Sequence, residues 1–139
     1  MNLKNKNILL VGLAKTGVST IKLLNKLEAN IIVNDIKDKE KLKDILEELK
    51  DIKNTEYILG YHPQNVDHID LAVVSPGVPL DLPFILKLKE ENIEVIGEVE
   101  LAYRLSKNPK FVPKSSVPGT LIEIPRIKIT KAANVKYIL

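Results

Sequence analysis

The first segment that could do chemistry is the loop Gly12-Leu13-Ala14-Lys15-Thr16-Gly17, which separates a predicted strand from a predicted helix. Glycine lets the chain turn tightly and lets the backbone approach a ligand. The helix that follows presents unpaired amide N–H groups and a partial positive charge, which attract phosphate or another anion. Compared with the dinucleotide fingerprint G-x-G-x-x-G, Ala14 replaces the middle glycine. We predict a ligand-binding turn here, and the alternative is a tight turn that binds nothing.

An acidic residue follows the second predicted strand. Asp35 lies 23 positions after Gly12, close to the spacing at which an acidic side chain accepts hydrogen bonds from a ribose or base. An N-cap or an exposed loop acid is an equally good interpretation. Lys37 could pair with a phosphate, but we favour a solvent-exposed pair with Asp38.

A third loop, Ser75-Pro76-Gly77, follows the fourth predicted strand directly. Proline restricts one backbone dihedral and glycine permits a left-handed turn. Because ligands bind at the carboxyl ends of the strands in open parallel sheets, three such loops at one edge indicate a site more strongly than any one of them.

No catalytic residue and no metal site is predicted. The chain has no cysteine and two histidines, and no carboxylate pair at helical spacing supports the histidines as ligands. We predict that His62, in a polar loop before Pro63, is a surface residue. No nucleophile stands beside a visible base.

Alternating strand and helix patterns must position these loops. Short apolar runs predict strands at residues 7–11, 30–34, 56–59, 70–74 and 93–96. Apolar residues at three- and four-residue spacing predict helices at residues 16–27, 39–50, 82–91 and 98–105. This alternation predicts an α/β fold with a Rossmann-like, doubly wound parallel sheet of about five strands. In the tail, residues 111–112, 120–124 and 126–130 have strand character, and residues 132–139 could form a strand or a helical turn.

Charge divides the 139-residue chain near position 107. Residues 1–106 carry 14 basic and 17 acidic side chains, whereas residues 107–139 carry 7 basic side chains and one acidic one. The net charge of +3 therefore combines −3 in residues 1–106 with +6 in residues 107–139. Since the excess positive charge lies in the tail, the pI near 9.0 is poor evidence that the protein binds nucleic acid. With 4% aromatic residues and no Trp, a platform for single-stranded nucleic acid is not expected. No apolar run is long enough to span a membrane, and we predict a cytoplasmic protein.

The motifs together resemble the amino-terminal part of the D-glutamate-adding Mur ligases of peptidoglycan synthesis. The resemblance covers about residues 5–106 and rests on four segments in order: 8–19, 33–35, 73–79 and 95–101. It implies that residues 1–96 are a Rossmann-like domain that binds UDP-N-acetylmuramoyl-L-alanine. Residues 97–139 would then be a linker helix and an incomplete or aberrant start of the ATP-binding domain.

The resemblance also implies which residues bind the UDP part of that substrate. The first loop would contact the diphosphate, the second would surround the uracil and ribose, and the third would border the nucleotide. Ile36 stands where the family often has a hydroxyl residue, which suggests a backbone contact. The implied residues are Leu13, Lys15, Thr16, Gly17, Asp35, Ile36, Lys37, Ser75, Pro76 and Gly77.

The family's P-loop, G-T-N-G-K-T-T, does not occur in this chain, which reads Pro113-Lys114-Ser115-Ser116-Val117-Pro118-Gly119-Thr120 after Val112. The lysine and hydroxyl residues that would hold ATP phosphates and magnesium are missing. We expect residues 1–139 to bind no cofactor and not to catalyse ligation. The resemblance implies ATP and magnesium as cofactors of the full-length family.

Two other classes of function stay open at this point. One is a stand-alone NAD(P)- or nucleotide-binding regulatory module, which the first loop and Asp35 fit. The Ser75-Pro76-Gly77 turn and the segment 97–100 are not expected there. The other is a structural fragment that associates through an uncovered face of its tail.

Overall fold

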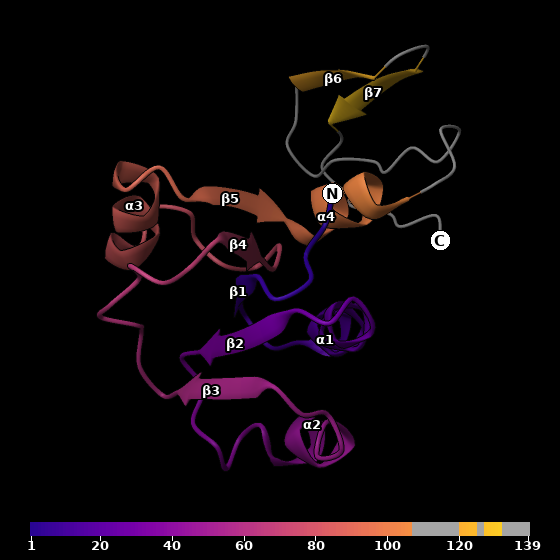
Figure 1. Ribbon diagram of the computed structural model, residues 1–139. Coiled ribbons are helices and arrows are strands. Elements are labelled where there is room, and N and C mark those ends of the chain that lie inside the picture. Colours follow the sequence, from indigo (N-terminus) through magenta and orange to yellow (C-terminus); the bar gives the residue numbers. More distant parts are fainter. Residues whose placement is uncertain (107–119, 125–126, 132–139) are drawn as a thin grey trace. The chain divides into compact units, whose positions relative to one another are not determined.

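A computed structural model describes residues 1–106, 120–124 and 127–131 of the chain (Figure 1). The chain divides into two compact units, Asn2–Ile96 and a second one made of Met1 and Gly97–Leu139. The first unit contains the three loops singled out above.

The sheet of the first unit contains five strands: β1 (Asn7–Val11), β2 (Asn30–Asp35), β3 (Thr55–Leu59), β4 (Leu71–Val74) and β5 (Glu94–Gly97). Their spatial order is β3-β2-β1-β4-β5. β1 pairs in parallel with β2 and β4, and β2 pairs in parallel with β3. This is the strand order of a Rossmann-like sheet, so the predicted α/β fold class is confirmed.

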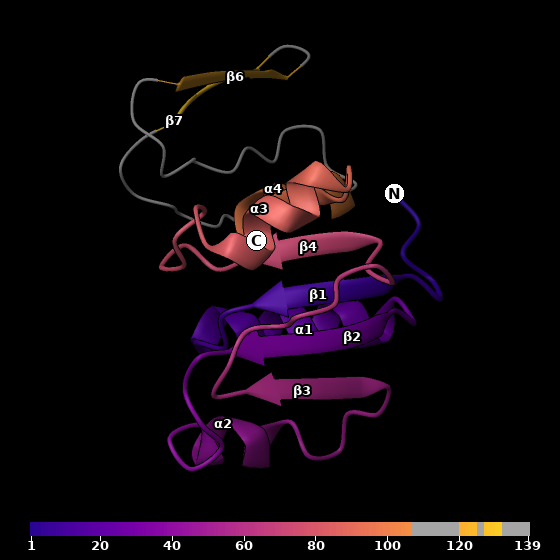
Figure 2. The same cartoon turned by 90° about the vertical axis from the view of Figure 1, so that its left-hand side faces the viewer.

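Helices cover both faces of this sheet (Figures 1 and 2). α1 (Lys15–Lys26) and α2 (Lys43–Glu48) lie on one face, and α3 (Pro83–Glu90) lies on the other. Side chains alternate between the two faces along each strand, and all four residues of β4 are buried. The sheet is therefore apolar on both sides, as a sheet between helices requires.

The core beneath α3 is built from alternate strand residues. Leu9 and Val11 of β1 and Ala72 and Val74 of β4 pack in one cluster with three buried residues of α3, namely Phe84, Ile85 and Leu88. The intervening strand residues face α1, as Leu10 does beside Gly17. Burial of these aliphatic side chains is the main source of stability for the unit.

The second helix is shorter than the sequence predicts. A helix was expected over residues 39–50, but α2 spans Lys43–Glu48 and turns occupy residues 39–42. The Asp38 carboxylate accepts a hydrogen bond from the Lys41 amide at 3.0 Å. This bond has the pattern of an N-cap, so a turn begins at Asp38. The Lys43 amide then bonds to the Glu40 carbonyl three residues back, so the turn is tighter than an α-helix and the regular helix begins only at Lys43.

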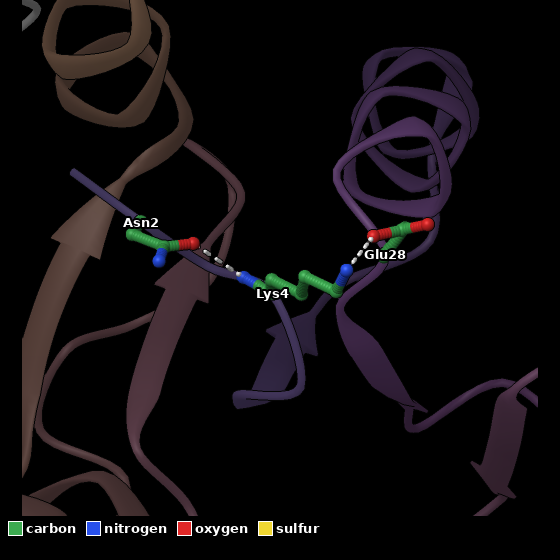
Figure 3. A network of polar contacts seen from close by, with 3 residues as sticks. All are labelled: Asn2, Lys4 and Glu28. Carbon is green, nitrogen blue, oxygen red and sulfur yellow. Dashed lines mark hydrogen bonds and ion pairs between the residues drawn. The ribbon is translucent and has the colours of Figure 1, made fainter.

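The edge of the sheet opposite the predicted loops is held by short polar contacts (Figure 3). The Lys4 amide donates to Asn2 Oδ1 at 3.1 Å, and the Lys4 ammonium pairs with Glu28 at 3.0 Å. Both charged side chains are exposed, so the ion pair adds little stability. The Asn5 amide also donates to the Glu28 carbonyl at 3.0 Å, which ties the amino terminus to the turn after α1.

The second unit contains α4 (Glu98–Leu105) and an antiparallel pair, β6 (Thr120–Ile124) and β7 (Ile127–Lys131). α4 agrees with the predicted helix, and both strands fall where the tail has strand character. The strand character of residues 111–112 and the ambiguous segment 132–139 lie outside the described residues.

Candidate functional site at the carboxyl edge of the sheet

The strand order brings the three predicted loops to one edge. β1 lies between β2 and β4, and all three strands run in the same direction. The loops that follow Val11, Asp35 and Val74 are therefore neighbours. The chain passes from β1 to β2 on one side, and after β3 it crosses back to β4 on the other side of β1. Ligands bind in open α/β sheets at the point where the strand order reverses in this way.

Gly12 is the position where these loops approach most closely. Its φ is +94°, and a Cβ there would lie 2.9 Å from both Ser75 Cβ and Val78 Cγ2. Its amide donates to the Asn34 carbonyl at 2.8 Å. Both the backbone conformation and the lack of space therefore require glycine, independently of any ligand.

Ser75 fastens the third loop to the first. Its hydroxyl donates to the Gly12 carbonyl at 2.9 Å, and its amide donates to the Val11 carbonyl at 2.9 Å. The residue is buried, at 6% exposure. Ser75 thus sets the distance between two loops, a structural role that the sequence analysis did not anticipate.

Asp35 fastens the second loop to the first in a similar way. One carboxylate oxygen accepts from the Leu13 amide at 2.7 Å, and the other accepts from the Lys37 amide at 2.8 Å. An ionised carboxylate offers about four acceptor positions. Asp35 is half-buried, so capacity to accept a further hydrogen bond remains.

The start of α1 offers amide donors at the same edge. The helix begins after Ala14 without a side-chain cap and has no acidic residue in its first turn. Its first internal bond runs from the Val18 amide to the Ala14 carbonyl at 3.2 Å. The amides of Lys15, Thr16 and Gly17 precede that bond and have no acceptor within the helix, so they suit an anion.

Gly17 serves the packing of α1 against β1 and is not exposed to a ligand. It is buried, and a Cβ there would lie 3.2 Å from the Gly12 carbonyl oxygen. Glycine therefore lets α1 pack closely against the end of β1, as the last glycine of a dinucleotide-binding loop does.

The structure separates the ten predicted site residues into two sets. The buried or half-buried set, which builds the edge, is Leu13, Gly17, Asp35 and Ser75. The exposed set, which a ligand can reach, is Lys15, Thr16, Ile36, Lys37, Pro76 and Gly77. The Leu13 side chain belongs to the core at 2% exposure, so it offers no ligand surface.

One polar group at this edge was missed by sequence reasoning. Asn34 is fully buried on β2, and its amide nitrogen donates to the carbonyls of Ile58 at 2.8 Å and Tyr61 at 2.7 Å. Its oxygen lies 3.3 Å from Nδ1 of His62. A polar residue between apolar strand residues is the only sequence signal that marks this role.

His62 was predicted at the surface, and this is wrong. The residue is half-buried, and its ring stacks on Phe84 of α3 with centroids 4.8 Å apart. The apolar face of α3 and the oxygen of Asn34 together give the imidazole both a packing surface and a polar partner.

A surface hollow adjoins the second loop. Its lining is Asp38, Lys39, Glu40, Lys43, Leu46 and Glu47. The two signs of charge are mixed along it, which favours no particular ligand charge. Within residues 1–106 and the two tail strands, no group of three or more His, Asp or Glu residues could hold a metal ion. The same part of the chain has no helix long and apolar enough to cross a bilayer.

Comparison with known proteins identifies the family. The family described as "Mur ligase MurD-like, N-terminal domain" matches residues 6–97. UDP-N-acetylmuramoylalanine–D-glutamate ligase of Clostridioides difficile is 68% identical over 119 residues, which cover 86% of this chain and 26% of that protein. The Alkaliphilus oremlandii ligase of the same name is 53% identical over 110 residues, covering 77% of this chain and 24% of its own.

A third relative aligns with nearly the whole sequence. The ligase of that name from Thermoanaerobacter sp. is 34% identical over 145 residues, covering 99% of this chain and 32% of its own. The chain thus spans about a quarter to a third of the length of these curated relatives. The match over residues 6–97 covers more than half of the chain, and the chain therefore belongs to the MurD-like Mur ligase family, with its N-terminal domain in these residues.

Proposed function

We propose that the carboxyl edge of this sheet binds the uridine diphosphate part of UDP-N-acetylmuramoyl-L-alanine. The observation that carries the proposal is the convergence of three loops, fastened to one another by Asp35 and Ser75. The names of the relatives support the choice of ligand, because these proteins are ligases that act on UDP-N-acetylmuramoylalanine.

The diphosphate would lie at the start of α1. The amides of the first helical turn and the exposed Lys15 ammonium supply donors and positive charge there. No acidic residue stands in that turn to repel the ligand.

The ribose and base would lie over the second loop. Asp35 keeps acceptor capacity beyond its two backbone bonds and can accept from a ribose hydroxyl. Ile36 and Lys37 are exposed beside it. Pro76 and Gly77, exposed after β4, would border the ligand on the other side of β1.

The proposal for this chain covers binding of the substrate and does not include the ligation reaction. Residues 1–139 contain no P-loop sequence, and ATP and magnesium would be held by such a loop in the family that the chain resembles. We propose that this chain holds the substrate and does not activate its carboxylate. The predicted cytoplasmic location belongs to the same proposal.

Isothermal titration calorimetry with UDP and with UDP-N-acetylmuramoyl-L-alanine tests the binding proposal. Lys15→Gln should weaken both ligands about tenfold, because it removes one charge-assisted hydrogen bond to phosphate. Lys26→Gln is the matched control, since it removes an exposed lysine from the opposite end of α1. NADH serves as the comparison ligand for a dinucleotide-binding module.

The outcomes separate the proposal from its alternatives. Binding of UDP that Lys15→Gln weakens and Lys26→Gln does not would support it. The absence of heat at millimolar ligand, from a chain whose circular dichroism shows it folded, would sink the proposal. Binding of NADH in preference to UDP would favour the regulatory module instead.

A further inference from the structure

Three large exposed apolar side chains belong to loops that follow the carboxyl ends of strands. Six such side chains are exposed in the described part of the chain: Met1, Leu23, Ile36, Tyr61, Leu80 and Leu86. Ile36, Tyr61 and Leu80 follow the ends of β2, β3 and β4. Single exposed apolar residues are ordinary, so the contacts that hold each loop decide whether its side chain suits a ligand.

The loop after β3 lies directly beside the second ligand loop. The Gly60 amide donates to the Asp35 carbonyl at 2.9 Å, which extends the pairing of β2 with β3 by one residue. A Cβ at Gly60 would lie 3.9 Å from Asp38 Cα. Tyr61 is the next residue, so its backbone lies beside residues 35–38.

The backbone of Tyr61 is also held from the inside of the fold. Its carbonyl accepts from the buried Asn34 amide nitrogen at 2.7 Å. The same nitrogen donates its second hydrogen to the Ile58 carbonyl at 2.8 Å. The Asn34 oxygen can then only accept, so Nδ1 of His62 must carry the proton that it donates. The ring of His62 stacks on Phe84, which anchors the loop to α3.

These contacts leave the Tyr61 side chain 59% exposed on a fixed backbone. An aromatic ring held in this way loses little conformational freedom when a planar ligand packs on it. Ile36, which follows the end of β2, has the same 59% exposure.

We propose that Tyr61 supplies the face on which the pyrimidine base of a bound uridine nucleotide packs. The inference rests on the proposed function and extends it from β1 and β2 to β3. Strands in a sheet lie about 4.8 Å apart, so the end of β3 lies about 10 Å from the end of β1. The ribose of a nucleotide whose diphosphate lies at α1 bridges that span.

Titration of the chain with UDP and with inorganic pyrophosphate tests the inference. Tyr61→Ala should weaken UDP about tenfold, because base–aromatic stacking is lost, and should leave pyrophosphate affinity unchanged. Tyr61→Phe should restore most of the UDP affinity, since stacking needs the ring and not the hydroxyl. Leu86→Ala, which removes an exposed apolar side chain from α3, is the matched control and should change neither.

Tyrosine fluorescence gives an independent readout, because the chain has four Tyr and no Trp. UDP should quench the emission of the unaltered chain, and the quenching should be lost in Tyr61→Phe although UDP still binds. Normal UDP binding by Tyr61→Ala, with quenching unchanged in Tyr61→Phe, would overturn the inference about Tyr61 alone. If the unaltered folded chain does not bind UDP at all, the proposed function fails and this inference fails with it.

Discussion

Replacing Gly12 with alanine should destabilise the first unit strongly, although it adds only one methyl group. The residue has a φ of +94°, a region that costs an L-residue about 1–2 kcal/mol. The new Cβ would also lie 2.9 Å from Ser75 Cβ and from Val78 Cγ2. Forcing such overpacking into a close-packed region costs about 1–3 kcal/mol. The two terms together give a loss of about 2–5 kcal/mol in the free energy of unfolding.

Urea unfolding followed by circular dichroism measures this loss. A domain of this size has a slope of about 2 kcal/mol per molar urea, so a loss of about 3 kcal/mol should lower the midpoint by about 1.5 M. The total stability of such a domain is about 5–15 kcal/mol, so the variant should still fold at low temperature.

Gly77→Ala is the matched control for this substitution. Gly77 follows β4 at the same edge, has no positive φ, and would place its Cβ with nothing within 4 Å. Its free energy of unfolding should change by no more than about 0.5 kcal/mol, as is usual for surface substitutions. If Gly12→Ala unfolds at the same urea concentration as Gly77→Ala, the argument from φ and close approach is wrong.

Two further predictions concern charge and hydrogen bonding in the first unit. Asp35→Asn should lower the free energy of unfolding by about 2 kcal/mol. Asparagine has one acceptor oxygen in place of two, so its amide nitrogen would face either the Leu13 or the Lys37 amide without accepting from it. Urea midpoints and faster hydrogen exchange at those amides check it, and unchanged values would show that the carboxylate does not fasten the loops. Burial raises the pKa of Tyr57 above its ordinary value of 10.0. Its contribution to stability is therefore fully present below pH 10 and is lost as the pH rises further, so Tyr57→Phe should flatten the fall in melting temperature above pH 10. A fall as steep as that of the unaltered chain would contradict this reasoning.

Most of the sheet could be predicted because its strands are short apolar runs between helical patterns. The run at residues 7–11 agrees with β1 to the residue, and those at 30–34 and 56–59 differ from β2 and β3 by one residue. α2 was less predictable, because the segment before Lys43 forms a tighter turn in which the Lys43 amide bonds to the Glu40 carbonyl three residues back. Such a bond depends on local geometry and leaves no periodic signal.

The candidate site was predictable in location but not in internal organisation. The three loops could be placed at one edge because the carboxyl ends of parallel strands coincide. Ser75 and Asp35 were expected to face a ligand, and both hold loops together through backbone partners up to 63 residues away. Asn34 and Tyr61 were not singled out, because only folding brings the buried amide to the loop after β3.

Residue types and their spacing alone were enough to establish the alternating α/β pattern, the family resemblance and the three loops at one edge, since these depend on periodicity and on short contiguous motifs. Only the tertiary structure decided which of those residues build the edge and which remain accessible. It did so because burial and hydrogen-bond partners are set between strands that are distant in sequence: Gly12 meets Ser75, and Asp35 meets Leu13, only when β1, β2 and β4 lie side by side.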